Sequence, residues 1–135
     1  MKSQSTSISA ESVKAALQTK GYPKDAEFRA RLVDAKLYGS GDRATKTKLI
    51  LEALEESYHH KEAVPFETLS IEHVMPQTLT EYWQNHLGDD WQATYELLLH
   101  TLGNLTLTAY NSELSNDTWE MKKELLSKSH LELND

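Results

Sequence analysis

The sequence has 135 residues, and 39% of them are hydrophobic, which is enough to form the buried core of one compact domain without stabilising cross-links. It contains no cysteine, which excludes disulfides, thiolate zinc sites and cysteine nucleophiles. The net charge is -7, and residues 66–129 carry only 3 Lys and Arg against 10 Asp and Glu. Because phosphate binding normally needs a basic surface, we expect this chain alone to bind nucleic acid weakly.

The chain has no apolar run of the length that a membrane helix requires. Residues 1–8 also have no apolar stretch that would serve as a secretion signal. We therefore expect a flexible polar lead-in at residues 1–8, no association with a membrane and a cytoplasmic location.

The first half of the chain has helical periodicity. We expect a short helix over residues 9–20, a second from residue 25 to about 37, and a third over roughly 44–59. The third helix has an apolar stripe that predicts its buried face, formed by Leu49, Ile50, Ala53, Leu54 and Tyr58. Together these segments predict a helical N-terminal platform over residues 9–61.

After residue 65 the pattern changes to alternation, the period of a strand, over residues 68–74. Pro76 cannot extend a central strand and so sets its end. Two inserted helices follow, then a second strand over 104–108, a polar loop over 111–116 and a last helix through about Lys128, with Asp117 and Glu120 as its capping box. We expect a mainly α (α+β) domain with a two-stranded antiparallel hairpin, a core at 66–129 and a tail at 130–135.

Two motifs carry the functional signal, and shorter ones follow them in a fixed order. They are Ile71-Glu72-His73-Val74-Met75-Pro76-Gln77 and Leu102-Gly103-Asn104-Leu105-Thr106-Leu107-Thr108, then Asn111, Leu114-Ser115-Asn116 and Trp119-Glu120-Met121-Lys122-Lys123. From about Leu49 onward the chain resembles the C-terminal HNH domain of GmrSD-type modification-dependent restriction endonucleases. The resemblance implies a ββα-metal (His-Me finger) core and a divalent-metal-dependent DNA endonuclease of a restriction or phage-defence system.

The resemblance also implies roles for individual residues. Hydrolysis of a phosphodiester needs a base that activates water and a cation that neutralises the phosphate. His73 would be the base, and Asn104 would hold the loop and strand around it. Glu72 and Asn111 would supply oxygen ligands for Mg²⁺ or Mn²⁺, with Asn116 as a further candidate.

The sequence departs from many HNH proteins at two positions, where Glu72 replaces an aspartate and Lys122 replaces a histidine in the helix. Because a protonated lysine is a poor metal ligand, we assign Lys122 to the scissile phosphate or to transition-state charge. Strict alternation also sends Glu72 and His73 to opposite faces. Both can serve one site only if the strand ends or bulges there.

The resemblance further implies an N-terminal nucleotide-binding or sensor domain or subunit, so we expect this chain to be a fragment or a separate nuclease subunit. Two alternatives stay open: a non-catalytic helical interaction module that keeps the hairpin as a scaffold, and a nuclease that acts on RNA or single strands. The other histidines are weaker candidates because they lie at expected helix ends or in the tail: His59, His60, His86, His100 and His130.

Overall fold

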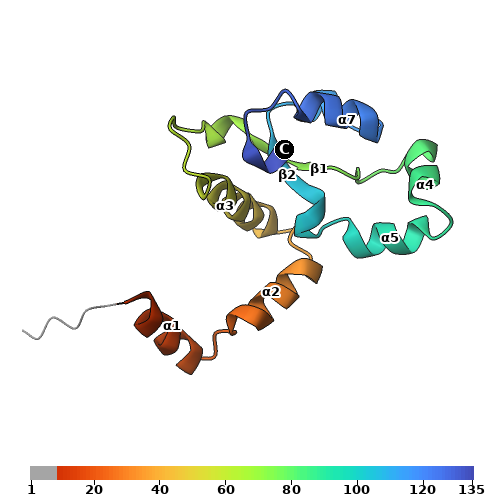
Figure 1. Ribbon diagram of the computed structural model, residues 1–135. Coiled ribbons are helices and arrows are strands. Elements are labelled where there is room, and N and C mark those ends of the chain that lie inside the picture. Colours follow the sequence, from red (N-terminus) through yellow and green to blue (C-terminus); the bar gives the residue numbers. More distant parts are fainter. Residues whose placement is uncertain (1–8) are drawn as a thin grey trace, which may run out of the picture. The chain divides into compact units, whose positions relative to one another are not determined.

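The computed structural model describes residues 9–135 (Figure 1). The flexible lead-in expected at residues 1–8 lies outside the described residues. The chain divides into two compact units, of which the first ends at Leu32 and the second is Val33–Asp135. The domain boundaries expected from the sequence stay a prediction. Over the described part of the chain, no helix is both long and apolar enough to cross a membrane.

The first unit holds α1 (Ala10–Thr19) and most of α2 (Asp25–Asp34). Two serines start α1, because the backbone N–H of Ser12 donates to Ser9 Oγ and that of Ser9 donates to Ser12 Oγ, each at 3.1 Å. Lys14 joins the two helices through an ion pair of 2.7 Å with Asp25, and this lysine lowers the pKa of the Asp25 carboxyl. The pair is solvent-exposed, so it contributes little to the stability of the fold.

The second helix ends at Asp34, three residues earlier than the sequence predicts. The following segment leaves the helical path because Leu37 N donates to His100 O at 2.8 Å. Lys36 Nζ also donates to the backbone carbonyl of Glu96, at 2.5 Å, and to that of Leu97. These bonds fasten residues 36–38 to the end of α5 (Trp91–Leu98).

The third helix, α3 (Arg43–Glu56), buries a face other than the expected apolar stripe. Leu49, Leu54 and Tyr58 are exposed, whereas the buried side chains are Thr47, Leu51 and Glu55. The polar members of this face have tertiary partners. Thr47 donates to Leu37 O, and the Glu55 carboxylate accepts the backbone N–H groups of Glu132 and Leu133 at 2.8 and 3.0 Å. A buried polar group that is fully hydrogen-bonded costs little, so these partners decide the orientation of the helix.

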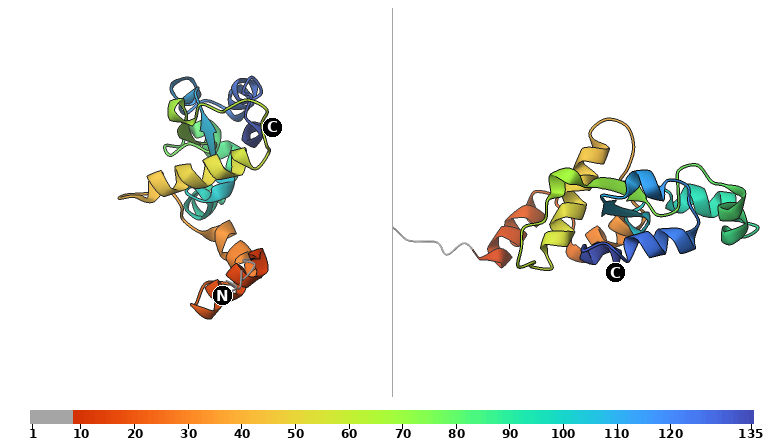
Figure 2. Two further views of the ribbon diagram at one scale, coloured as in Figure 1. Left: turned by 90° about the vertical axis from the view of Figure 1, so that its left-hand side faces the viewer. Right: turned by 90° about the horizontal axis from the view of Figure 1, so that it is seen from above.

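The second unit is built around an antiparallel hairpin of β1 (Ser70–His73) and β2 (Leu105–Thr108). The register pairs Ser70 with Thr108 and His73 with Leu105. Between the strands lie α4 (Glu81–Leu87), α5 and a short 3₁₀ turn, Leu102–Asn104, and a second such turn, Phe66–Thr68, precedes β1. Figure 2 shows α3, the hairpin, α5 and α4 following one another along this unit. The arrangement confirms the expected mainly α (α+β) class and the two-stranded hairpin.

After β2 the chain forms α6 (Asn111–Leu114), where a loop was expected, and then α7 (Trp119–Leu126). The cap of α7 is Thr118, one residue after the expected Asp117, and its hydroxyl accepts the Met121 N–H. The last residues are not a free tail. Leu131 joins Leu51, Leu105 and Leu107 in the core, and Asn134 bonds to both Thr106 and Leu107 of β2.

Candidate active site

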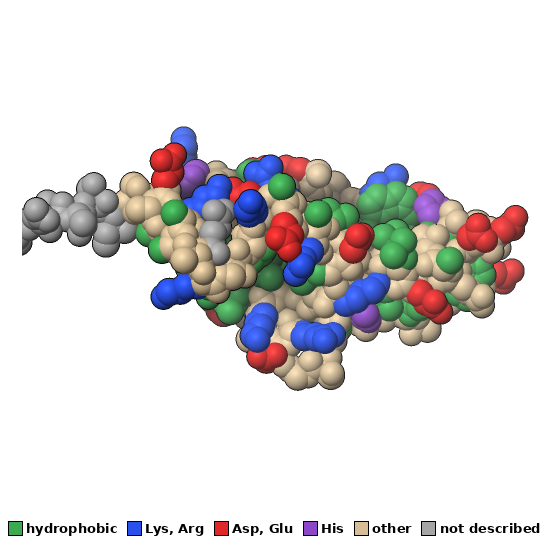
Figure 3. All heavy atoms as spheres, turned by 90° about the horizontal axis from the view of Figure 1, so that it is seen from below, with side chains coloured by type: hydrophobic (Ala, Val, Ile, Leu, Met, Phe, Trp, Pro, Cys, Tyr) green, Lys and Arg blue, Asp and Glu red, His purple; other side chains and the backbone are tan. Residues whose placement is uncertain are grey.

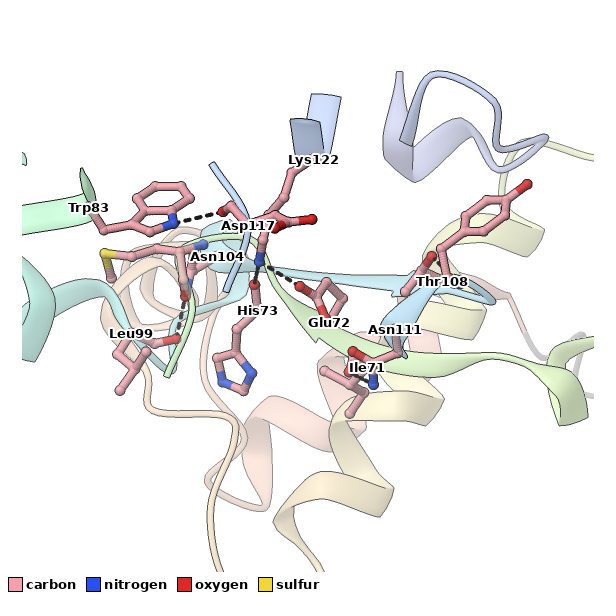
Figure 4. A network of polar contacts seen from close by, with 12 residues as sticks. Ile71, Glu72, His73, Trp83, Leu99, Asn104, Thr108, Asn111, Asp117 and Lys122 are labelled. Carbon is pink, nitrogen blue, oxygen red and sulfur yellow. Dashed lines mark hydrogen bonds and ion pairs between the residues drawn. The ribbon is translucent and has the colours of Figure 1, made fainter. Parts of the chain in front are cut away.

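The end of β1 is fastened by one buried amide, that of Asn104. Its Oδ1 accepts the Met75 N–H at 2.7 Å, and its Nδ2 donates to Met75 O at 3.0 Å and Leu99 O at 2.9 Å. The backbone adds a bond from Val74 N to Asn104 O at 3.0 Å. Asn104 thus fixes the chain directly after His73 and joins it to the end of α5 (Figure 4).

A cleft of about 210 Å³ opens at this end of the hairpin. Four of the residues expected in the site line it: Glu72, His73, Asn111 and Asn116. Glu72 and His73 meet in one cleft although they are consecutive in a strand, because β1 ends at His73 and no bulge is required. The other lining residues are Tyr38, Ile71, Pro76, Gln77, Thr78 and Ser115. Asn104 and Lys122 do not line the cleft and lie behind it.

His73 is 6% exposed, and its Nε2 lies 3.1 Å from Nδ1 of His100. The Tyr38 ring meets the His73 ring edge to face at 4.5 Å between centroids. Burial, together with the positive charges that His100 and Lys122 can carry, lowers the pKa of His73 to about 4. The imidazole is therefore uncharged at neutral pH and has a lone pair that can accept a proton.

Glu72 forms a buried ion pair with Lys122, whose Nζ lies 2.7 Å from Glu72 Oε1. The lysine side chain is 0% exposed and that of the glutamate 6%. Nζ also donates to His73 O at 3.0 Å, so one ammonium group holds two consecutive residues of β1 (Figure 4). Burial raises the pKa of the Glu72 carboxyl, and Lys122 opposes this rise. The burial of Lys122 does not fit the direct phosphate contact that we expected for it.

Asn111 and Asn116 lie on the exposed rim of the cleft, at the two ends of the short turn around α6. Asn111 Nδ2 is 3.5 Å from Ile71 O, a long hydrogen bond. Ser115 between them has a φ of 34°, a left-handed conformation that is unusual for a residue with a side chain. This reversal allows the residues on either side of it to face the same cleft.

The donor atoms of the cleft fit a hard, partly hydrated cation better than a soft one. They include one carboxylate, on Glu72, and the amide oxygens of Asn111 and Asn116. Within residues 9–135 no group of three or more His, Asp or Glu side chains is placed to hold a metal. Mg²⁺ keeps several waters and binds through one or two carboxylates, so it suits this set, whereas a structural zinc site does not.

Two residues of the site, Tyr38 and His100, were missed from the sequence. Tyr38 is half-buried and comes from the segment before α3, 35 residues away from His73, and nothing in its local pattern marks it. His100 follows α5, and its position at an expected helix end does not mark it as a residue of the site. The available signal was that His100 lies four residues before Asn104 and two residues before the second motif begins.

The family model described as "GmrSD restriction endonucleases, C-terminal domain" matches residues 22–135. No curated protein and no solved structure matched the chain. The family match covers well over half of the sequence and includes every residue that lines the cleft. The resemblance carried by the two motifs is therefore confirmed, and the chain belongs to the family of C-terminal domains of GmrSD restriction endonucleases.

Proposed function

We propose that this domain is an HNH-type endonuclease module that hydrolyses DNA phosphodiester bonds with the help of a divalent cation. Membership of the family gives the nuclease role in restriction. The observation that carries the finer assignment is the meeting of Glu72, His73 and Asn111 at one cleft, within a strand–strand–helix unit. A base and oxygen ligands for a cation around one small cavity are what hydrolysis of a phosphodiester requires.

His73 is the proposed general base. Its ring is uncharged at neutral pH and lines the cleft, so it can take a proton from a water molecule bound there. Asn104 acts through the backbone by fixing the turn after His73, as its three side-chain hydrogen bonds support. Lys122 positions Glu72 and the His73 carbonyl from behind, in place of the phosphate contact expected from the sequence.

Glu72 and Asn111 are the proposed ligands of Mg²⁺ or Mn²⁺, with Asn116 as a further ligand on the same rim. When bound, the cation would neutralise charge on the phosphate and the leaving oxygen. Glu72 would serve both Lys122 and the proposed cation. Its Oε1 accepts a hydrogen bond from the Lys122 ammonium, and its other oxygen has no hydrogen-bond partner among the described residues. This sharing favours a cation held in part by waters and by the substrate phosphate.

DNA binding by this domain is proposed to be weak. Figure 3 shows acidic side chains gathered at the end of the second unit formed by α4 and α5, where Glu81, Asp89, Asp90 and Glu96 are exposed. Such a surface repels phosphate and offers no release of counterions. We therefore propose that a nucleotide-binding or sensor domain or subunit supplies most of the affinity for DNA and the selection of its modification.

Nicking of supercoiled plasmid tests the proposal. Nicking by wild type, His73→Ala and His86→Ala is measured in the presence of Mg²⁺ or Mn²⁺. His86 is an exposed histidine of α4 outside the cleft, so its variant is the matched control. We expect nicking by wild type and His86→Ala that EDTA abolishes, and no nicking by His73→Ala. Metal-dependent nicking that survives His73→Ala would remove this residue from its role. No nicking at any enzyme concentration would favour the interaction module, and preferential cutting of RNA or single strands would favour the other alternative.

Mn²⁺ binding measured by titration calorimetry tests the metal ligands separately from activity. We expect Glu72→Gln and Asn111→Ala to weaken the binding of Mn²⁺. Asn85→Ala, which changes an exposed asparagine of α4, is the control and should leave binding unchanged. Equal affinity in all four proteins would contradict the ligand assignment even if the domain cuts DNA.

A further inference from the structure

The proposed base has two ring nitrogens, and only one of them can face the reacting water. His73 Nε2 is engaged with His100 Nδ1 at 3.1 Å. Its Nδ1 has no hydrogen-bond partner among the described residues, and in that part of the chain no fully buried polar side-chain atom lacks a partner. His73 Nδ1 is therefore not fully buried, and the ring that carries it lines the cleft.

The hydrogen bond between the two rings contains a single hydrogen, so its direction decides which tautomer each ring adopts. If His73 Nε2–H donates, Nδ1 of His73 carries a lone pair and faces the cleft as a base. If His100 Nδ1–H donates instead, His73 Nδ1 carries the hydrogen and cannot accept a proton from water. The nuclease role proposed for His73 requires the first direction.

Ring chemistry favours that same direction. When His73 donates, both imidazoles carry their hydrogen on Nε2, which is the more stable tautomer of neutral histidine. When His100 donates, both rings are forced into the less stable Nδ1–H form. We infer that His100 is a positioning residue that accepts the Nε2–H of His73 and so keeps the Nδ1 lone pair of His73 directed into the cleft. This inference rests on the proposed role of His73 as the base.

His100 is held in place from two sides, as a positioning residue must be. The Tyr38 ring stacks on it at 5.6 Å between centroids and 27° between planes, and also meets His73 edge to face. The His100 carbonyl accepts the Leu37 N–H at 2.8 Å. Lys36 fastens the same segment to the end of α5. Tyr38 and His100 thus form a brace against the His73 ring, whereas Lys122 holds the His73 carbonyl.

Nitrogen-15 NMR of the imidazole rings at neutral pH tests the assignment, because a ring nitrogen that carries hydrogen and one that carries a lone pair resonate far apart. The signals of His73 are assigned by their loss in His73→Gln. We expect Nε2 of His73 to carry the hydrogen and Nδ1 to carry the lone pair in wild type. A hydrogen on Nδ1 of His73 in the wild-type protein would overturn the inference, and this readout needs no variant of His100.

Two substitutions separate positioning from packing. His100→Phe keeps a ring against Tyr38 but removes the acceptor, whereas His100→Asn restores an acceptor oxygen near the Nδ1 position. We expect a mixture of His73 tautomers in His100→Phe, with kcat for nicking lowered about five-fold, the value of one hydrogen bond, and KM unchanged. His100→Asn should restore the Nε2–H form and most of kcat. His86→Phe, the same change at an exposed site of α4, should alter neither.

Identical tautomer populations in wild type and His100→Phe would overturn the inference, as would an equal kcat in both proteins. A rise in KM without a fall in kcat would also overturn it, because that pattern reports lost binding of substrate. The tautomer readout does not depend on DNA cleavage. Absence of nicking by wild type, by contrast, would overturn the proposed function on which the inference rests, so the two failures are distinguishable.

Discussion

The buried pair of Glu72 and Lys122 gives the sharpest test of how the site is built. In Lys122→Met the Glu72 carboxylate loses its ammonium partner at 2.7 Å, and the His73 carbonyl loses its donor at 3.0 Å. Both charged side chains are at least 94% buried, so water replaces the lost contacts only poorly. In Glu72→Gln the situation is reversed, since the lysine remains charged in a buried position.

Each single substitution should lower the free energy of unfolding by about 3–5 kcal/mol, the usual cost of leaving one buried charge without its partner. The double variant, Glu72→Gln with Lys122→Met, removes both charges and should cost far less than the sum. Because burial already raises the pKa of Glu72, its carboxyl in Lys122→Met should take up a proton as the pH falls, which limits the loss below neutral pH.

Urea unfolding of the four proteins, followed by tryptophan fluorescence, measures this thermodynamic cycle. Lys128→Met is the matched control, because Lys128 pairs with Glu124 at 3.5 Å with both side chains more than half exposed, and such pairs contribute about 0.5 kcal/mol. The interpretation fails if Lys122→Met costs no more than Lys128→Met, or if the two single effects simply add in the double variant.

Three further predictions concern the elements around the cleft. The pKa of His73 is about 4 in the folded protein, below its ordinary value of 6.5, so protonation favours the unfolded chain. The free energy of unfolding should therefore fall by about 2 kcal/mol between about pH 7 and pH 4.5. Urea titrations of His73→Gln should not show this fall. Asn104→Ala leaves the backbone N–H and C=O of Met75 without their side-chain partners, so the free energy of unfolding measured by thermal unfolding should fall by about 2–4 kcal/mol. An effect below about 0.5 kcal/mol would refute the role of Asn104 in fastening the end of β1. Leu131→Ala should cost about 2–4 kcal/mol in chemical unfolding and the exposed Leu49→Ala about 0.5, and the reverse order would contradict the observed face of α3 and the burial of the C-terminal segment.

The parts of the fold that depend on local pattern could be predicted from the sequence. Alternation and Pro76 indicated the first strand and its end, and the structure stops β1 at His73. The two linked motifs indicated the hairpin and the family, and both are confirmed. Four of the six residues expected in the site, Glu72, His73, Asn111 and Asn116, do reach one cleft, because each lies next to the end of a strand or a short turn. Their roles in catalysis stay a prediction.

The remaining features depend on partners that are far apart in the sequence. Glu55 is buried because its carboxylate binds backbone groups 77 and 78 residues later, and no local pattern indicates that pairing. Lys122 is buried because Glu72 lies 50 residues before it, although a lysine in an amphipathic helix normally faces solvent. Tyr38 reaches the cleft only because the segment after α2 is fastened to the end of α5.

The most direct test of the central claim is the single-turnover rate at which the domain cleaves a short DNA duplex with saturating Mg²⁺. Removal of a general base lowers such rates by about 10²–10⁴-fold. The single-turnover rate of His73→Ala should therefore fall by a factor of at least about 10², whereas His86→Ala should keep the wild-type rate. A His73→Ala rate equal to that of wild type would contradict the assignment of the cleft at the end of β1 as the nuclease site.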